Sequence, residues 1–348
     1  MRLNRVLLIG STGYFGRLLI EDLIRHVACD LVLASRHHFR SSGFQTVVAD
    51  LGDVASLERA LAGVNVAICA AGPYQKLPTT LAELCLERGI HYIDLADDPG
   101  FVQKVRSIAA DHEHNASAIC TGWSTVSALS GLLAKIAAAG IMPVHSIHIQ
   151  MAPGNRGARR TGTIASLMHS VGRPFTVIRN GVRRNVLGWS EPREFVFPSP
   201  VGKRCGYLVD VPDHEIFPQL FGARTVEFRA GSELQFLNAC ISLMGRTRQN
   251  WAEWSGLLQR AAALLSWIGN DYGAIGVEVS GSGARRACII ADSRAERIAV
   301  MPASVMTARL LSGGAQHSGL ISYTDWLTEQ DLRRECERRD FRLIVEEL

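Results

Sequence analysis

Three glycines spaced three apart, Gly10, Gly13 and Gly16, directly follow the short apolar run Val6–Ile9. The first allows a tight turn, the second lets backbone N–H groups approach a pyrophosphate at a helix start, and the third lets that helix pack closely on the strand. A sharp turn without a ligand is the alternative. The pattern predicts a dinucleotide-binding turn formed by Gly10, Ser11, Thr12, Gly13, Tyr14, Phe15 and Gly16.

The residues after the next apolar run, Leu31–Ala34, indicate which dinucleotide binds. NAD sites usually place Asp or Glu there to accept from the ribose 2′-hydroxyl, but this chain has Ser35 and Arg36. A guanidinium pairs with a 2′-phosphate and stacks on adenine, and the serine adds a hydroxyl donor. The sequence therefore predicts NADP(H), with a solvated arginine at a strand end as the alternative.

Two more segments extend the predicted cofactor site. Asp50 follows the apolar run Thr46–Val48, where side chains commonly approach the adenine, although a turn or helix-cap role explains it equally well. Small residues after the run Val66–Cys69 let the backbone lie beside the cofactor ribose and then turn away from the sheet. These residues are Ala70, Ala71, Gly72 and Pro73.

Hydride transfer also requires a proton donor near the nicotinamide. The candidate catalytic residues are Tyr74, Asp97 and His214. The first two follow strands at the carboxyl edge of the predicted sheet, and His214 stands beside acidic residues, although an exposed turn is the alternative there. We expect Asp94 to order its loop through backbone hydrogen bonds. Trp123 walls the nicotinamide pocket or is an ordinary core tryptophan.

Several other chemistries are disfavoured by what the sequence lacks. No tyrosine has a lysine four residues on, which excludes the tyrosine and lysine pair of classical short-chain dehydrogenases. The eight cysteines form no C-x-x-C pair and the histidines show no H-x-x-x-H spacing, so we expect reduced thiols, a cytoplasmic protein and no metal. The net charge of +4 is small and the basic pairs are scattered, which disfavours nucleic acid.

Alternating strands and helices must position these residues. Up to about residue 139, short Val, Ile and Leu runs alternate with amphipathic segments, as in βαβ units with a parallel sheet. The predicted strands are 6–9, 31–34, 46–48, 66–69, 92–95 and 118–120, and the predicted helices are 15–26, 55–62, 79–88, 101–111 and 127–139. After Pro143, polar and apolar residues alternate at 145–150, 194–197, 207–210, 225–228, 277–280 and 287–291, with helices near 163–170 and 249–267.

The expected fold class is α/β: a Rossmann doubly wound parallel sheet, followed by an α+β domain with a mainly antiparallel sheet. We expect an NADP-binding Rossmann domain at 1–142, a substrate or dimerisation domain at 143–300, and a C-terminal helical segment at 301–348 that packs back on the Rossmann domain. The apolar stretch Val126–Met142 is interrupted by Lys135 and Gly140, so no stable membrane insertion is predicted. An antiparallel sheet with one face uncovered favours a homodimer.

The first domain resembles the saccharopine dehydrogenase (saccharopine reductase)-like family. The resemblance is carried by the segment Gly10–Gly16, by Ser35-Arg36, by Ala70–Tyr74 and by Gly89–Leu95, with less specific matches later in the chain. It implies NAD(P)-dependent oxidoreduction of a small-molecule substrate, often at a C–N bond. Members act on different substrates, so saccharopine is not implied. A carbonyl or enoyl reductase, and a non-catalytic protein that holds NADP(H) as a structural or sensing ligand, remain the alternatives.

Overall fold

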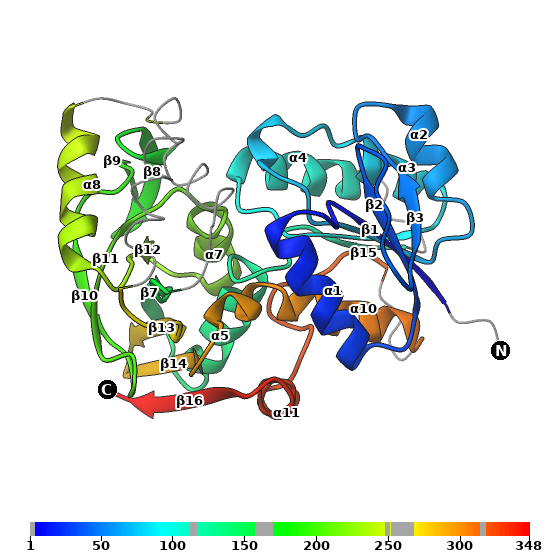
Figure 1. Cartoon of the computed structure of the whole chain (residues 1–348). Helices are drawn as coiled ribbons and strands as arrows, with labels where there is room; N and C mark the ends of the chain where they lie inside the picture. The colour runs from blue at the N-terminus through cyan, green and yellow to red at the C-terminus, as the bar shows by residue number, and fades with distance from the viewer. Residues whose placement is uncertain (1–3, 112–116, 157–169, 248–250, 252–267, 314–317) are drawn as a thin grey trace. The chain divides into compact units, whose positions relative to one another are not determined.

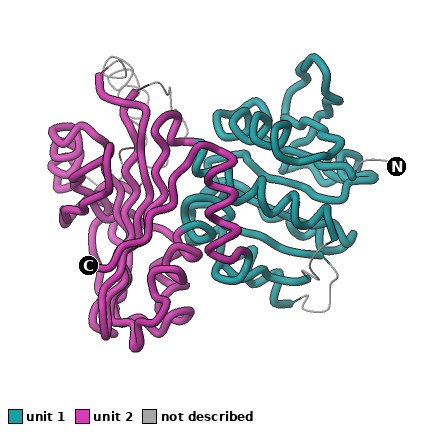
Figure 2. The backbone as a smooth tube through the Cα atoms, turned by 90° about the horizontal axis from the view of Figure 1, so that it is seen from below, with its two compact units in different colours: residues 1–129, 297–326 teal, residues 130–296, 327–348 magenta. Residues whose placement is uncertain are grey.

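The computed structural model describes residues 4–111, 117–156, 170–247, 251, 268–313 and 318–348. The chain divides into two compact units (Figure 2). Unit 1 contains residues 1–129 and 297–326, and unit 2 contains residues 130–296 and 327–348. Each unit is built around its own sheet.

Unit 1 contains a seven-stranded parallel sheet in the order β15-β6-β5-β4-β1-β2-β3. Its strands are β1 (Arg5–Ile9), β2 (Asp30–Ser35), β3 (Gln45–Val48), β4 (Val66–Cys69), β5 (His91–Asp94), β6 (Ala118–Cys120) and β15 (Gly319–Leu320). Strand order reverses at β1, which has β2 on one side and β4 on the other. Ligands bind open α/β sheets at such a reversal, beyond the carboxyl ends of the strands. The predicted Rossmann sheet is confirmed.

Helices cover both faces of this sheet, with α1 and α10 on one face and α2, α3 and α4 on the other (Figure 1). They are α1 (Tyr14–His26), α2 (Val54–Ala60), α3 (Thr80–Glu87), α4 (Pro99–Ala110) and α10 (Met301–Leu311), with the single turn η1 (Tyr74–Lys76). Because both faces are covered, β1 from Val6 to Ile9 and all of β4 are buried. Aspartates begin two of the helices: Asp53 accepts from the Ser56 amide and Asp98 accepts from the Phe101 amide.

Unit 2 contains a nine-stranded sheet with the path β10-β11-β12-β7-β13-β14-β16 and the hairpin β8–β9 attached to β12. Its strands are β7 (Val144–Ala152), β8 (Pro174–Arg179), β9 (Val182–Leu187), β10 (Arg193–Val196), β11 (Lys203–Leu208), β12 (Thr225–Ala230), β13 (Gly273–Gly281), β14 (Ala284–Ala291) and β16 (Phe341–Glu347). The pair β12 and β7 is parallel and the other pairs are antiparallel, so the sheet is mixed.

Cross-strand register places different residues on the two faces of this sheet. His148 lies opposite Glu227 of β12 and Glu278 of β13, so these polar side chains share one face. The next residues along the strands, Ile149 and Phe228, point to the other face and are buried. One face of the sheet is therefore apolar and the other carries charges.

Unit 2 also contains helices α7 (Asp213–Phe221), α8 (Gln235–Thr247) and α11 (Glu329–Glu337), while α5 (Ala128–Ala138) begins in unit 1 and continues into unit 2. The remaining short element is η3 (Ala295–Ala299). Helix α7 occupies the segment for which an exposed turn was the alternative, and it ends at Gly222 with φ +64°. The predicted helix 163–170 lies almost wholly, and 249–267 wholly but for one residue, outside the described residues.

The last part of the chain is shared by the two units. The sequence predicted a helical segment at 301–348 that packs back on the Rossmann domain. Residues 297–326 do belong to unit 1, whereas residues 327–348 belong to unit 2. The reason lies in β16, which pairs with β14 over seven residues and extends the edge of the second sheet. Among the described residues, no helix combines the length and apolar character needed to cross a bilayer.

Candidate functional site

The glycine turn connects β1 to α1 at the strand reversal of unit 1. Gly10 has φ +82°, and a Cβ atom there would lie 2.5 Å from the Ala71 amide nitrogen. A Cβ atom at Gly16 would lie 2.2 Å from the Gly10 carbonyl oxygen. Backbone therefore approaches backbone at both positions, which only glycine allows. This close approach fixes the start of α1 against the exit of β4.

The start of α1 offers backbone amides to an anion. Its N-cap is Gly13, which has no capping side chain, and its first turn contains no acidic residue. Gly13 is exposed. Amides at such a helix start, together with the positive end of the helix dipole, bind phosphate groups. The local structure therefore fits the pyrophosphate of a dinucleotide at the predicted residues Gly13, Tyr14 and Phe15.

Ser11 and Thr12 have different roles within the turn. Ser11 is buried, and its hydroxyl donates to the Ala34 carbonyl at 2.9 Å, as does its own amide at 3.3 Å. Its side chain thus holds the turn against the end of β2. Thr12 is exposed, and its carbonyl accepts from the Arg17 guanidinium. The structure therefore leaves Thr12, rather than the Ser11 hydroxyl, open to a ligand.

Ser35 and Arg36 end β2 beside this turn. The Ser35 hydroxyl donates to the His37 carbonyl at 2.7 Å and orders the local backbone. Arg36 is exposed, and no hydrogen bond or ion pair is recorded for it within the described part of the chain. An exposed guanidinium without an acidic partner is available to a phosphate group.

The remaining predicted cofactor contacts lie on two neighbouring loops. Asp50 Oδ1 accepts from the Gly52 amide at 2.9 Å, so this carboxylate shapes the turn after β3. Beyond β4, the Ala70 amide donates to the Ile9 carbonyl at 2.9 Å, which holds the exit of β4 beside β1. Ala71 is half-buried, while Gly72 and Pro73 are exposed and are joined by a cis peptide bond. The backbone from Ala71 to Pro73 is therefore accessible to a ligand where the cofactor ribose is expected.

Tyr74 bridges two strand ends. Its hydroxyl donates to the Cys69 carbonyl at 2.7 Å and accepts from the Leu95 amide at 3.0 Å. Burial raises the pKa of this phenol well above its usual value, and the charge of Asp94 adds to the effect. A buried hydroxyl already engaged with backbone on both sides favours a positioning role for Tyr74.

The loop after β5 contains three aspartates with different surroundings. Asp94 is buried, and its Oδ1 accepts from the Ala96 amide at 2.9 Å and from the Gly122 amide at 2.8 Å, which confirms its predicted ordering role. Burial raises its pKa to about 6, although the two amides act to lower it. Asp98 caps α4. Asp97 is partly exposed, between these two structural carboxylates.

Trp123 is a core residue. It is fully buried, and its ring lies 5.7 Å from Tyr323 and 5.8 Å from Trp326, centroid to centroid. The Tyr323 hydroxyl donates to the Thr121 carbonyl at 3.0 Å, so this aromatic cluster anchors residues after β15 to the end of β6. The core alternative for Trp123 is thereby confirmed.

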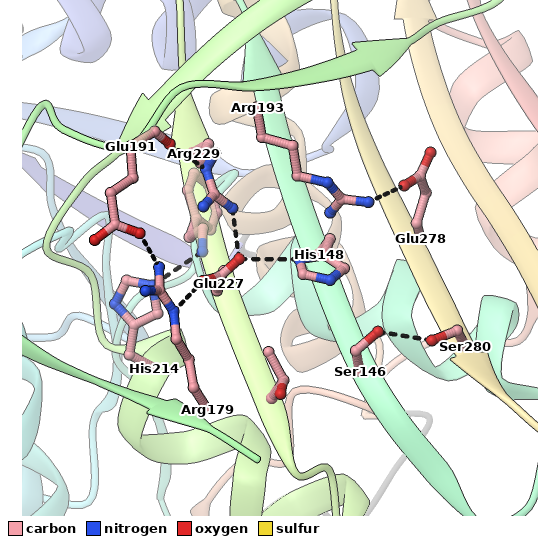
Figure 3. A network of polar contacts seen from close by, with 12 residues as sticks. Ser146, His148, Arg179, Glu191, Arg193, His214, Glu227, Arg229, Glu278 and Ser280 are labelled. Atoms are coloured by element: carbon pink, nitrogen blue, oxygen red, sulfur yellow. Dashed lines mark hydrogen bonds and ion pairs between the residues drawn. The ribbon is translucent and has the colours of Figure 1, made fainter. Parts of the chain in front are cut away.

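The polar face of the unit 2 sheet holds a network of paired charges (Figure 3). Glu227 accepts from Arg179 and from Arg229, and lies 3.2 Å from His148 Nδ1. Arg193 pairs with Glu278 at 2.9 Å across the same face. Burial acts to raise the pKa of Glu227, but the hydrogen bonds from His148 and Arg229 dominate and hold it well below its usual value.

His214 lies beside this network, with different contacts. Its Nε2 accepts from the Phe228 amide at 2.9 Å and its ring stacks on Phe175 at 5.4 Å. The side chain is buried, and burial lowers its pKa to about 3, so the ring is neutral at physiological pH. These contacts join α7 to β12 and β8, and they favour a structural role for His214.

Sequence reasoning did not single out His148, Glu227 or Arg17. The network residues come from strands far apart in the chain, and no local spacing marks them. Arg17 directly follows the third glycine, so its position alone was a usable signal. No group of three or more His, Cys, Asp or Glu side chains suited to a metal ion occurs in the described ranges.

Comparisons with known proteins agree with this geometry. Residues 6–121 match the model of the saccharopine dehydrogenase NADP binding domain. No curated protein sequence matches the chain. Among solved structures, apo histidine-tagged saccharopine dehydrogenase (L-Glu forming) from Saccharomyces cerevisiae is similar, with a TM-score of 0.68 and 12% identity over 99% of this chain and 100% of that chain.

An engineered D-amino acid dehydrogenase bound to NADP+ is also similar, with a TM-score of 0.50 and 14% identity over 95% of this chain and 98% of that chain. At these identities the structures establish a shared fold. The family match covers the glycine turn, Arg36 and the strand ends described above. Residues 6–121 therefore match the NADP binding domain of saccharopine dehydrogenase, and this match supports an NAD(P)-dependent oxidoreductase.

Proposed function

We propose that the protein is an NADPH-dependent oxidoreductase that transfers hydride to or from a small-molecule substrate at a C–N bond. The observation that carries this proposal is Arg36, an exposed cation without an acidic partner among the described residues, at the end of β2 beside an uncapped helix start. The two similar structures are a saccharopine dehydrogenase (L-Glu forming) and a D-amino acid dehydrogenase, which favours C–N chemistry.

Each part of the site has a defined task in this proposal. NADP(H), when bound, supplies the hydride carrier. The first amides of α1 bind its pyrophosphate, Arg36 binds its 2′-phosphate, and the backbone at Ala71 and Gly72 lies beside its ribose. Tyr74 and Asp94 hold the ends of β4, β5 and β6 in register, so that the loops carrying Asp97 and Gly122 keep a fixed spacing.

Asp97 is the proton-transfer group that we favour among the three candidates. It is partly exposed at the carboxyl edge of the sheet, whereas Tyr74 and His214 are buried. Removing a positioned acid or base typically lowers turnover by about 100-fold to 10,000-fold. We expect Asp97→Asn to lower kcat by that amount and to leave the Kd of NADPH within about 2-fold, since a cofactor contact would change Kd instead.

The cofactor assignment is tested by fluorescence titration of NADPH against Arg36→Ala. Loss of a charge-assisted pair is expected to weaken NADPH binding by about 10-fold to 100-fold and to leave NADH nearly unchanged. Arg25→Ala is the matched control, because it removes an equal charge from an exposed position in the last turn of α1. Equal losses in the two variants, or no NADPH binding by the unmodified protein, would contradict the proposal.

Two alternatives predict different products. A carbonyl or enoyl reductase would oxidise NADPH with ketone or enoyl substrates and not with imines, so product analysis over the three substrate classes separates them. The engaged hydroxyl of Tyr74 and the buried ring of His214 favour a second alternative, a non-catalytic protein that holds NADP(H). Such a protein would bind NADPH tightly but would not oxidise it with imine, ketone or enoyl substrates.

We also propose a homodimer. Its support is the polar face of the second sheet, where Arg193 and Glu346 are partly exposed while their partners Glu278 and Arg286 are largely buried. Balanced charges on a partly open sheet face suit pairing with a second copy. Light scattering after size-exclusion chromatography is expected to give twice the 38.0 kDa chain mass, and a monomer at micromolar concentration would contradict it.

A further inference from the structure

Arg17 is an arginine that the proposed function does not yet use. It directly follows Gly16 in α1, is exposed, and its Nε donates to the Thr12 carbonyl at 3.1 Å. That hydrogen bond bends the side chain back over the glycine turn. No acidic partner is recorded for Arg17 within the described part of the chain, so its terminal nitrogens have no protein anion to bind.

The contacts of the turn bring Arg17 toward the end of β2. The amides of Gly10 and Ser11 and the Ser11 hydroxyl all donate to the Ala34 carbonyl. Thr12 follows directly, so the carbonyl that holds Arg17 lies next to the exit of β2. Arg36 stands two residues beyond Ala34 on that same exit. Arg17, in α1, and Arg36, after β2, are thus linked through the Thr12 carbonyl, the glycine turn and the Ala34 carbonyl.

The segment after β2 carries two exposed arginines, Arg36 and Arg40, and the first turn of α1 has no acidic residue. Asp50 at the end of the adjacent β3 accepts from the Gly52 amide. A phosphate monoester is the ligand chemistry that two unpaired guanidinium groups favour.

We propose that Arg17 and Arg36 together bind the 2′-phosphate of NADP(H), while the pyrophosphate is left to the amides at the start of α1. This inference rests on the proposed function, because it assigns a further specificity residue to the same cofactor. The proposed function assigns the preference for a 2′-phosphate to Arg36 alone, whereas this inference assigns it to residues of two elements, β2 and α1. Arg17 then strengthens the binding of nucleotides that carry a 2′-phosphate and does not affect the binding of those that lack one.

The test compares nucleotides that differ only in the 2′-phosphate, measured by calorimetry without any substrate. Adenosine 2′,5′-bisphosphate is paired with 5′-AMP, and NADPH with NADH. Arg17→Ala is expected to weaken the bisphosphate and NADPH by about 10-fold to 100-fold and to change 5′-AMP and NADH by less than about 2-fold. Arg25→Ala, at the other end of α1, is expected to change none of the four.

A double-mutant cycle sharpens the result. If both guanidinium groups bind the same phosphate, the losses in Arg17→Ala and Arg36→Ala are not independent, and the double variant departs from the product of the single losses. Arg17→Lys keeps the charge but not the fork, and is expected to fall between wild type and Arg17→Ala. Thermal unfolding of each variant checks that the turn is intact.

Two results overturn the inference while the proposed function survives: equal weakening of NADPH and NADH by Arg17→Ala, which places Arg17 on the pyrophosphate, or no change in either. Failure of the unmodified protein to bind NADPH overturns the proposed function and this inference with it. The two failures are therefore distinguished by the wild-type titration alone.

Discussion

Arginines have opposite surroundings in the two units. In unit 1, Arg17 and Arg36 lie at the glycine turn and the end of β2, and no carboxylate is recorded as their partner within the described residues. In unit 2, Arg179, Arg193 and Arg229 each pair with a glutamate on the sheet. Paired charges stabilise a fold and leave little for a ligand, whereas unpaired ones at a helix start mark a place where an anion binds.

Buried carboxylates differ between the units in the same way. Asp94 of unit 1 accepts from two backbone amides, has no cationic partner among the causes of its shift, and has a raised pKa, while Glu227 of unit 2 is surrounded by cations and has a lowered one. Backbone dipoles offset burial less fully than a guanidinium does. The two groups should therefore respond to pH and to substitution with opposite signs.

The largest expected effect concerns the paired network. Glu227→Ala leaves Arg229, whose side chain is 7% exposed, without its carboxylate, and is expected to lower the free energy of unfolding by about 3–5 kcal/mol. Binding of NADPH should stay within about 2-fold. Urea denaturation measures the first quantity and fluorescence titration the second. Glu194→Ala, which removes one partner of an exposed pair with Lys203, is the control and should cost at most about 1 kcal/mol.

Substitution in the glycine turn should instead act mainly on NADPH binding. Gly10→Ala places a Cβ atom 2.5 Å from the Ala71 amide nitrogen and is expected to weaken NADPH binding by about 100-fold or more. Gly43→Ala is a matched control, since Gly43 has φ +85° but no atom within 4 Å of the added Cβ. Similar losses of affinity in the two variants would show that backbone strain alone, and not the close approach at the turn, explains the effect.

The pH dependence of stability separates the two carboxylates. The folded-state pKa of Asp94 is raised to about 6, so the folded chain binds this proton more tightly than the unfolded chain does. The contribution of Asp94 to the free energy of unfolding should therefore fall by about 2–3 kcal/mol as pH rises from 4 to 6. Glu227, with a lowered pKa, contributes stability above its unfolded pKa that is lost on acidification.

Asp94→Asn keeps an oxygen that accepts from Ala96 and Gly122 but removes the titration of this carboxyl. Its stability should lack the decline that Asp94 contributes between pH 4 and 6, as measured by chemical denaturation at several pH values. A wild-type curve that rises between pH 5 and 6, or one that the substitution leaves unchanged, would show that Asp94 does not carry this dependence.

The smallest expected effect is at Tyr74. Tyr74→Phe removes the hydroxyl shared by the Cys69 carbonyl and the Leu95 amide, and should cost about 1–3 kcal/mol of stability. Because we assign Tyr74 a positioning role, kcat should fall by less than about 10-fold. A loss of 100-fold or more with an unchanged melting temperature would instead identify Tyr74 as the proton donor.

Local patterns predicted the first unit well. Short apolar runs fixed the strands through β6, and the glycine spacing with Arg36 predicted the cofactor before any contact was known. Those features are local because the turn, the helix start and the strand end follow one another within about thirty residues.

The second unit was harder to predict because its contacts are long-range. Glu227 and His148 meet only through the pairing of β7 with β12, and β16 joins the sheet from the end of the chain. Helix α7 was not predicted as a helix, since Pro212 and Pro218 obscure its apolar periodicity. His214 consequently looked like a possible exposed base, whereas its ring is buried against Phe175.

The central claim is that Arg36 at the end of β2 and Arg17 at the start of α1 select NADP(H). Its most direct test is the ratio of dissociation constants for NADH and NADPH. It is measured on the unmodified protein by fluorescence titration at about 0.15 M salt, where exposed charges are realistically screened. We predict that NADPH binds at least about 10-fold more tightly than NADH. Equal affinities, or tighter binding of NADH, would contradict the account.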